Sequence, residues 1–157
     1  MAADVVRDLA YSIRLMCAGD TTAVSRLLSL TPEAVVWPEP GIKEVLDWPG
    51  VVAMVVESEG AFAGFLLARQ VADEAEILNL AIEERNRRRG LATALLLGAQ
   101  AKLQFLGAKR LFLEVRASNR AAISFYLRHG FSDAGRRTRY YRDPVEDALI
   151  LQKPLAG

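Results

Sequence analysis

The sequence is poor in cysteine and histidine, with one residue of each, Cys17 and His129. A single cysteine excludes an internal disulfide, and a single histidine excludes a metal centre built on several histidines. Acidic and basic residues nearly cancel, leaving a net charge of +1. The chain as a whole therefore has no field that would attract nucleic acid or a membrane surface, and any basic site must be local.

Long apolar runs are also missing. No stretch approaches the roughly 20 residues that a bilayer-spanning helix needs. The first residues carry Asp4 and Asp8 where a secretory signal requires a basic and then an apolar segment. We therefore expect a soluble, cytoplasmic protein. A length of 157 residues, of which 52% are hydrophobic, predicts a single domain over 1–157, with 1–11 as a loose N-terminal extension.

Strand and helix patterns alternate through the middle of the chain, which is typical of an α/β protein. β-rich runs predict strands over 12–17, 51–57, 62–71, 75–82, 110–115, 131–141 and 146–153. Helical spacing and capping residues predict helices over 21–30, 90–106 and 118–129, with a short helix near 42–46 after a proline-rich loop. Gly60 is expected at a hairpin turn between the second and third strands.

Several residues in these elements have structural interpretations of their own. Asp20 or Thr21 is expected to cap the first helix through its side-chain oxygen. Cys17 is expected to be a small core residue of the first strand. His129 is expected to cap the C-terminus of its helix. In the strand at 75–82, strict alternation predicts that Leu78, Leu80 and Ile82 face one side and Ile77, Asn79 and Ala81 the other.

A cluster of arginines, Arg85 and Arg87–Arg89, stands directly before Gly90 and an amphipathic helix that extends to Leu106. The first amides of a helix lack backbone acceptors, and the helix dipole adds positive charge there, so such an entrance can bind an anion. Small residues at 90 and 92 would let a phosphate approach these amides. The pattern predicts a pyrophosphate site made mainly of backbone. A solvated basic surface or an RNA contact remains an alternative.

Two motifs then resemble a known family. Arg87 to Ala92 resembles the Q/R-x-x-G-x-G/A coenzyme motif of the GNAT superfamily of acetyl-coenzyme A dependent N-acetyltransferases, and "SNRAAISFYLRHGF" resembles its later N-x-x-A-x-x-F/Y-Y-x-x-x-G-F motif. From Val71 to Leu151 the chain is similar to the RimI-type enzymes, the ribosomal-protein-alanine N-acetyltransferases. The resemblance implies a GNAT fold: a mixed, mostly antiparallel central sheet with splayed parallel strands in the middle and helices on both faces.

The resemblance also implies a cosubstrate site and no metal. Acetyl-coenzyme A should lie where the two parallel strands splay apart, with its pantetheine arm paired to strand backbone like an added strand. Its pyrophosphate should lie on helix amides, and an asparagine should hold the end of the pantetheine. By resemblance the binding residues are Leu80, Ala81 and Ile82 for the arm, Arg87, Arg88, Arg89, Gly90, Leu91, Ala92 and Thr93 for the pyrophosphate, and Asn119.

The catalytic residues follow from the same resemblance. Glu114 matches the general base of the RimI type, and Tyr126 matches the general acid. An α-amino group titrates near about 7.7–8.0 and a lysine near about 10.4, so a carboxylate neutralises an N-terminus more easily. The implied reaction is acetylation of a protein N-terminus, with a small-subunit ribosomal protein that begins with alanine as the acceptor.

Alternatives remain open for both roles and for the function. Glu114 can be a solvent-facing strand residue and Tyr126 a core residue. Other superfamily members carry the base on the preceding strand, which here holds Glu74, Glu76 and Asn79. Trp37 and Trp48 either line an acceptor groove or pack the proline-rich loop. The competing functions are acetylation of a small-molecule amine, and a non-catalytic module that binds acyl-coenzyme A, or RNA through 85–89 and 136–139.

Overall fold

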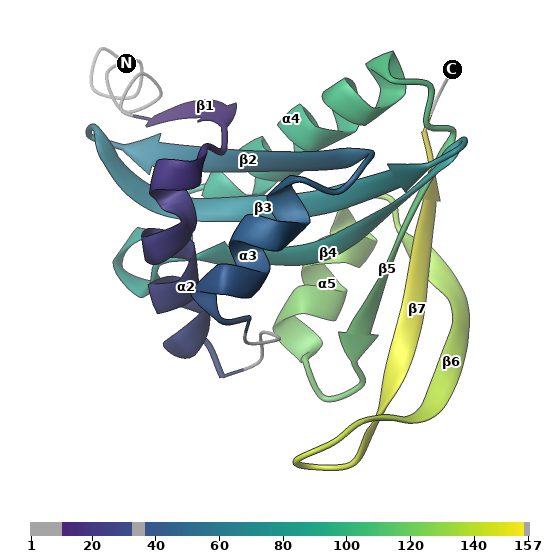
Figure 1. Ribbon diagram of the computed structural model, residues 1–157. Helices are drawn as coiled ribbons and strands as arrows, with labels where there is room; N and C mark the ends of the chain where they lie inside the picture. Colours follow the sequence, from purple (N-terminus) through teal and green to yellow (C-terminus); the bar gives the residue numbers. More distant parts are fainter. Residues whose placement is uncertain (1–10, 33–36, 156–157) are drawn as a thin grey trace, which may run out of the picture.

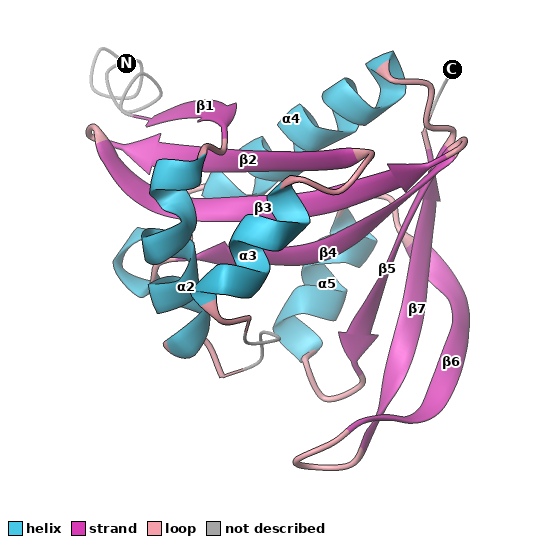
Figure 2. Cartoon of the chain, in the orientation of Figure 1, coloured by secondary structure: helices cyan, strands magenta, loops and turns pink. Residues whose placement is uncertain are grey.

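A computed structural model describes residues 11–32 and 37–155 of the protein (Figure 1). Its strands form one seven-stranded sheet in the order β1-β2-β3-β4-β5-β7-β6 (Figure 2). The strands are β1 (Tyr11–Leu15), β2 (Val51–Ser58), β3 (Ala61–Val71), β4 (Glu74–Ile82), β5 (Arg110–Arg116), β6 (Ser132–Tyr141) and β7 (Glu146–Pro154). The helices are α2 (Thr21–Ser29), α3 (Glu39–Leu46), α4 (Leu91–Phe105) and α5 (Arg120–Arg128), with the short 3-10 helices η1 (Ala18–Asp20) and η2 (Glu84–Asn86).

The sheet is mixed, as predicted. β4 and β5 are parallel, and every other neighbouring pair is antiparallel. The β2–β3 hairpin turns at Glu59 and Gly60, which have φ of 53° and 80°. Positive φ at both central residues matches the right-handed twist of the flanking strands. The predicted extension at 1–11 lies outside the described residues, except for Tyr11, which begins β1.

Helices cover both faces of the sheet, with α2 and α3 in front and α4 and α5 behind in Figure 1. Each face has its own apolar core: Leu95, Leu96, Ala99 and Leu103 of α4 belong to one, and Val24, Leu27, Leu28 and Ile42 of α2 and α3 belong to the other. Leu106, predicted to lie on the buried stripe of α4, is 46% exposed just past the helix end. Within the described residues, no helix is long and apolar enough to cross a membrane.

The predicted alternation of β4 breaks at Leu78, because a β-bulge interrupts the strand there. Ala68 of β3 pairs with Ile77, but the next residue, Leu67, pairs with Asn79, so Leu78 has no opposite partner. An extra residue reverses the direction of every side chain that follows. Ile77, Leu80 and Ile82 therefore face the α4 side, whereas Leu78 and Ala81 face the α2 side.

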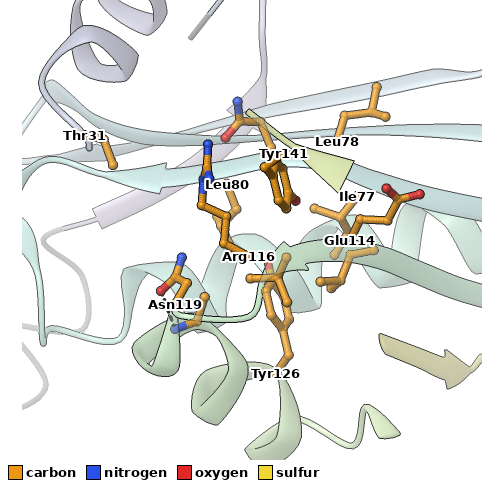
Figure 3. A pocket seen from close by; sticks show the side chains of 13 residues that line it. Thr31, Ile77, Leu78, Leu80, Glu114, Arg116, Asn119, Tyr126 and Tyr141 are labelled. Carbon is orange, nitrogen blue, oxygen red and sulfur yellow. Dashed lines mark hydrogen bonds between the residues drawn. The ribbon is translucent and has the colours of Figure 1, made fainter. Parts of the chain in front are cut away.

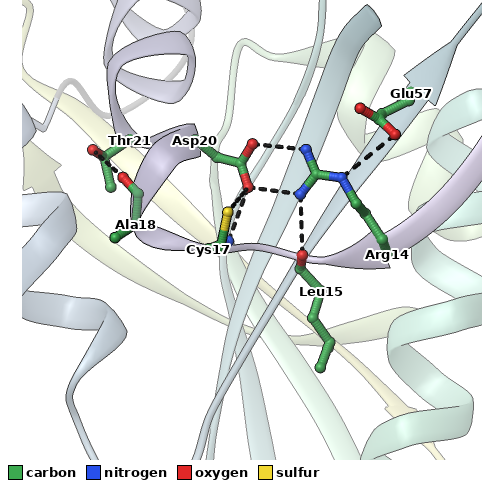
Figure 4. A network of polar contacts seen from close by, with 7 residues as sticks. All are labelled: Arg14, Leu15, Cys17, Ala18, Asp20, Thr21 and Glu57. Carbon is green, nitrogen blue, oxygen red and sulfur yellow. Dashed lines mark hydrogen bonds and ion pairs between the residues drawn. The ribbon is translucent and has the colours of Figure 1, made fainter. Parts of the chain in front are cut away.

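The start of the first helix also differs from the prediction (Figure 4). Asp20 makes no side-chain cap to α2. Its carboxylate instead accepts two hydrogen bonds of 2.7 Å from the Arg14 guanidinium and one of 2.8 Å from the Cys17 amide. Thr21 donates its hydroxyl to the Ala18 carbonyl and does not cap α2 either. Cys17 is exposed beyond the end of β1 and is not a core residue.

The ion pair makes the stability of this corner depend on pH. The hydrogen bonds from Arg14 lower the pKa of Asp20 from 3.8 to about 2. A carboxyl whose pKa is depressed on folding stabilises the protein above its unfolded pKa, and this stabilisation is lost as the pH falls through the folded pKa. Asp20→Asn is therefore expected to lower the free energy of unfolding by about 1–2 kcal/mol near neutral pH.

Urea unfolding of both proteins, from neutral pH down to pH values near the folded pKa, checks this expectation. The difference between variant and wild type should shrink between about pH 4 and pH 2, because Asp20 becomes protonated in both folded and unfolded chains. Glu59→Gln, at the exposed hairpin turn, serves as a control that should change stability little at any pH. A difference for Asp20→Asn that is constant across this range would contradict the assignment.

Candidate active site

The functional site begins where β4 and β5 separate. Their parallel pairing extends only from Glu74↔Arg110 to Ile77↔Leu113. Beyond it the strands enclose a cavity of about 150 Å³ (Figure 3). The lining comes from β4 and β5 and from the end of α2, the start of α5 and the end of β6: Thr31, Ile77, Leu78, Asn79, Leu80, Leu113, Glu114, Val115, Arg116, Asn119, Ala122, Tyr126 and Tyr141. Unpaired strand edges of this kind can hydrogen-bond an extended ligand.

A second cavity, of about 430 Å³, continues the first toward the start of α4. The two share the lining residues Thr31, Leu80, Ala122 and Tyr126. The second is also lined by most of the residues that the sequence assigned to the coenzyme, namely Leu80, Ala81, Ile82, Arg87, Arg88, Gly90, Leu91, Ala92 and Thr93. One cleft thus connects the predicted anion site with Glu114, and Tyr126 lies at the junction.

The entrance of α4 has the features that an anion site needs. Gly90 precedes the helix with φ of 79°, and an added Cβ there would meet nothing within 4 Å. The Ala94 amide donates to the Gly90 carbonyl at 3.1 Å, so the amides of 91–93 precede this bond and have no acceptor inside the helix. A diphosphate such as that of coenzyme A fits this arrangement, because free amides face a concave surface with no side chain in the way.

The side chains of the arginine cluster stabilise the turn before α4. Arg87 donates through Nε to the Ile82 carbonyl at 3.2 Å, and Arg89 donates to Asn86 Oδ1 at 3.0 Å. Arg85 pairs with Glu83 at 3.4 Å. Of the predicted coenzyme residues, Arg89 does not line either cavity of the cleft, and Asn119 lines only the part near Glu114. The arginine side chains therefore hold the turn before α4 in its conformation, and they also add positive charge near the start of the helix.

His129 connects the end of α5 to the first turn of α4. Its Nδ1 lies 2.7 Å from the Phe125 carbonyl and its Nε2 lies 3.0 Å from the Thr93 hydroxyl. A carbonyl only accepts, so Nδ1 carries a proton, and in a neutral imidazole Nε2 then accepts from Thr93. This confirms the predicted cap. It also ties Thr93, which lines the cleft, to the helix that carries Tyr126.

Two features of α5 position Tyr126. Asn119 caps the helix by accepting a hydrogen bond of 3.2 Å from the Ala122 amide. The Tyr126 ring packs edge-on against Phe125 and Phe131, each with ring centroids 5.2 Å apart. Burial raises the pKa of Tyr126 above its ordinary value, so the phenol stays protonated at neutral pH. The side chain is therefore both a core residue and part of the cleft lining.

Glu114 lies on β5 with its two carboxylate oxygens in different environments. Oε1 accepts a hydrogen bond of 3.0 Å from Arg137 Nε on β6. Oε2 is buried and has no hydrogen-bond partner. Native structures rarely leave a buried polar atom unsatisfied, and such an atom often marks a reactive site or a bound group. The free oxygen is therefore the reactive candidate.

Glu114 alters the pKa of several neighbouring groups. Burial, and then the charge of Glu114, raises the pKa of Glu76 on β4. The Glu114 carboxylate beside Tyr140 also raises the pKa of that phenol. Burial and then Glu114 raise the pKa of Tyr141 to about 12. Groups with perturbed pKa values that interact with one another in this way are typical of an active site.

The sequence-based candidates separate in the structure. Glu74 forms an ion pair with Arg110 and does not line the cleft. Glu76 remains close to Glu114, and Asn79 lines the cavity beside it. Neither tryptophan is among the described lining residues: Trp37 packs against the core on the α2 side, and Trp48 lies 5.1 Å beneath the Arg69 guanidinium. Both tryptophans therefore have packing roles.

Sequence reasoning missed three residues around Glu114, namely Arg116, Arg137 and Tyr141. Arg116 stacks 4.4 Å over the Tyr141 ring and pairs with Glu146 at 3.2 Å. The available signal was the period-two spacing of Glu114 and Arg116 on one strand, which places both on the same face. No local sequence pattern shows that β6 pairs with β7, or that Arg137 contacts Glu114 on β5.

Comparisons with known proteins agree with this geometry. Residues 22–131 match the acetyltransferase (GNAT) family. The chain is 41% identical over 99 residues, 62% of its length and 67% of the relative's, to the [ribosomal protein bS18]-alanine N-acetyltransferase of Escherichia coli K12. The crystal structure of the ribosomal-protein-S18-alanine N-acetyltransferase from Escherichia coli superposes with a TM-score of 0.85 at 32% identity, covering 94% of this chain and 95% of that one. Ard1 from Thermoplasma volcanium superposes with a TM-score of 0.84 at 28% identity, covering 94% and 99%.

The anion site can be tested with a pair of glycine variants. Gly90→Glu is expected to weaken coenzyme A binding by about 100-fold or more, because it places bulk and negative charge where the diphosphate would approach the amides. Isothermal titration of the purified protein with coenzyme A measures this loss. Gly60→Glu is the matched control: Gly60 has φ of 80° and equally open surroundings, but lies at the β2–β3 turn.

Gly60→Glu should therefore bind coenzyme A like the wild type, while it carries a similar backbone strain. Thermal unfolding of both variants reports that strain directly. Unchanged affinity in Gly90→Glu would remove the α4 entrance as the anion site, and equal losses in the two variants would assign the effect to strain.

Proposed function

The chain belongs to the GNAT family of acetyltransferases, and we propose that it acetylates the α-amino group of a protein N-terminus. Members of this family use acetyl-coenzyme A as the acetyl donor, and the chain is an N-acetyltransferase. The acceptor that we propose is an alanine at the N-terminus of a small-subunit ribosomal protein. The similarity to the Escherichia coli enzyme that acts on ribosomal protein bS18 supports this choice.

The observation that carries the proposal is the continuous cleft from the α4 entrance to Glu114. At one end, the amides of 91–93 would bind the diphosphate of the donor. In the middle, the free edge of β4 at Leu80–Ile82 would pair with its extended arm. At the other end, Oε2 of Glu114, which is buried and has no hydrogen-bond partner, would receive the acceptor amine. The donor and the acceptor would thus enter from opposite ends of the sheet gap.

Glu114 and Tyr126 have the chemistry that the transfer requires. Bound acetyl-coenzyme A would supply the acetyl group as a thioester. Glu114 Oε2, directly or through a water molecule, takes a proton from the acceptor nitrogen, whose lone pair then forms the new N–C bond. As the C–S bond breaks, the Tyr126 phenol gives its proton to the sulfur, and the resulting phenolate takes the second proton that the nitrogen loses as the amide forms. The raised pKa of Tyr126 keeps the phenol protonated at neutral pH before the transfer.

An α-amino acceptor suits a carboxylate base better than a lysine does. The α-ammonium has an ordinary pKa of about 7.7–8.0, so a sizeable fraction is neutral near physiological pH, whereas lysine titrates near about 10.4. Two carboxylates, Glu114 and Glu76, also surround the expected acceptor position with negative charge. They would attract the cationic form of the amine before it is deprotonated.

A pair of glutamate variants tests the base. Glu114→Gln is expected to lower kcat by about 100-fold or more, because the proton acceptor is lost. The affinity for coenzyme A should not change, since Glu114 lies at the far end of the cleft. Glu76→Gln is the matched control, because its carboxylate is also partly buried and interacts with Glu114, and its kcat should fall by less than about 10-fold. Larger loss in Glu76→Gln than in Glu114→Gln would move the base to β4.

The acceptor class is tested by supplying alternative amines. A short peptide with a free N-terminal alanine, incubated with protein and acetyl-coenzyme A, should release free thiol and gain one acetyl group at its α-nitrogen by mass spectrometry. The same peptide with a blocked N-terminus and an internal lysine is the control and should not react. Turnover with polyamines or aminoglycosides but not with the peptide would instead identify a small-molecule acetyltransferase.

A further inference from the structure

Arg137 reaches the site from a strand that is not adjacent to β5 in the sheet. β7 lies between β5 and β6, and Arg137 and Arg116 both pair with Ala148 of β7, from opposite sides. The Arg137 side chain crosses this strand to place Nε 3.0 Å from Glu114 Oε1. Glu114 is only 14% exposed in this pair, whereas Arg137 is 54% exposed. The arginine therefore covers the carboxylate on its solvent side.

Glu114 faces one negatively charged group and one positively charged group. From β4 it faces Glu76, whose pKa is raised by burial and by Glu114 and lowered by Arg137. From β6 it faces Arg137 and the phenols of Tyr140 and Tyr141, which are neutral at physiological pH. Arg116, on β5 itself, is directed to Glu146 at 3.2 Å. Arg137 is thus the cation that acts on both carboxylates.

We propose that Arg137 is a positioning residue that holds Glu114 by Oε1, leaves Oε2 free for the acceptor, and limits the negative charge that the acceptor amine meets. This inference rests on the proposed role of Glu114 as the base. The two carboxylates and Arg137 together carry one net negative charge, enough to attract an ammonium group. Without Arg137 they would carry two.

Arg137 would affect the pKa of the acceptor amine as well as the affinity for it. A stronger negative environment stabilises the ammonium form of the amine, so the acceptor binds more tightly but gives up its proton only at higher pH. Two unit charges a few ångströms apart near a protein surface interact strongly enough to shift such an equilibrium by about one pH unit. Arg137 would therefore lower the affinity for the acceptor and raise kcat near neutral pH.

The test is steady-state kinetics of Arg137→Gln as a function of pH. The KM for the alanine peptide is expected to fall about 3- to 10-fold, and kcat at neutral pH is expected to fall about 5- to 10-fold. The acid limb of the kcat profile should move up by about one pH unit, so that kcat recovers at high pH. Arg137→Lys, which keeps the charge, should restore most of the wild-type profile.

Arg136→Gln is the matched control. Arg136 is the neighbouring residue of β6, is 56% exposed, and pairs with Asp147 at 2.9 Å, away from Glu114. This variant should keep the wild-type kcat profile. The affinity for coenzyme A, measured by titration, should be unchanged in all three variants, because Arg137 does not line the part of the cleft near α4.

The outcomes separate this inference from the proposed function. If the wild type acetylates a small amine and not the peptide, the proposed function fails and the same profiles are measured with that amine. An unchanged acid limb in Arg137→Gln, with whichever amine the enzyme uses, overturns the inference. So does a higher KM with a kcat that is lowered equally at every pH and not rescued by Arg137→Lys, because that result indicates a structural role only.

Discussion

The active cleft depends on one interruption in backbone pairing, the separation of β4 from β5. The two strands are joined only through Glu74–Ile77 and Arg110–Leu113, and the bulge at Leu78 bends β4 away at the point where pairing stops. A fully paired parallel ladder would leave no free backbone and no space in the middle of the sheet. Because the strands diverge, both edges become available to a ligand, and the side chains at the divergence face the cleft.

The rest of the site is arranged around this gap by the helices on the α4 side. α4 begins at the end of β4, so its free amides face one end of the cleft, and α5 follows β5, so Tyr126 lies at the middle. His129 links the two helices through Thr93 and the Phe125 carbonyl. Both contacts are short and partly buried, so they fix the spacing between the first turn of α4 and the end of α5.

Electrostatics differ at the two ends. At the α4 entrance, positive charge comes from amides and a helix dipole, and the arginine side chains mostly bond to nearby carbonyl and amide oxygens. At the β5 end, two partly buried carboxylates dominate, and Arg137 from the edge strand partly offsets their negative charge. An anionic donor and a cationic acceptor would therefore bind at opposite ends of the cleft, each where the local charge is opposite to its own. This favours binding of both in one orientation.

Local elements were predictable because their causes lie within a few residues of chain. The β2–β3 turn at Gly60, the extent of α4 after Gly90 and the caps made by Asn119 and His129 follow from glycine conformations, apolar spacing and helix-end chemistry. The errors at Cys17, Asp20 and Leu78 share another cause. Asp20 pairs with Arg14, and the bulge arises from the pairing of β4 with β3. Both features therefore depend on residues that the local sequence pattern does not include.

The sequence by itself determined the family resemblance, the order of strands and helices, and the identity of Glu114, Tyr126 and the α4 entrance as candidates, because motifs and periodicity are properties of neighbouring residues. Only the tertiary structure decided that these residues share one cleft, that Glu114 has one bound and one free oxygen, and that Arg137 is its partner. Those facts depend on strand order and on the distance between side chains far apart in the chain, and spacing along a sequence contains neither.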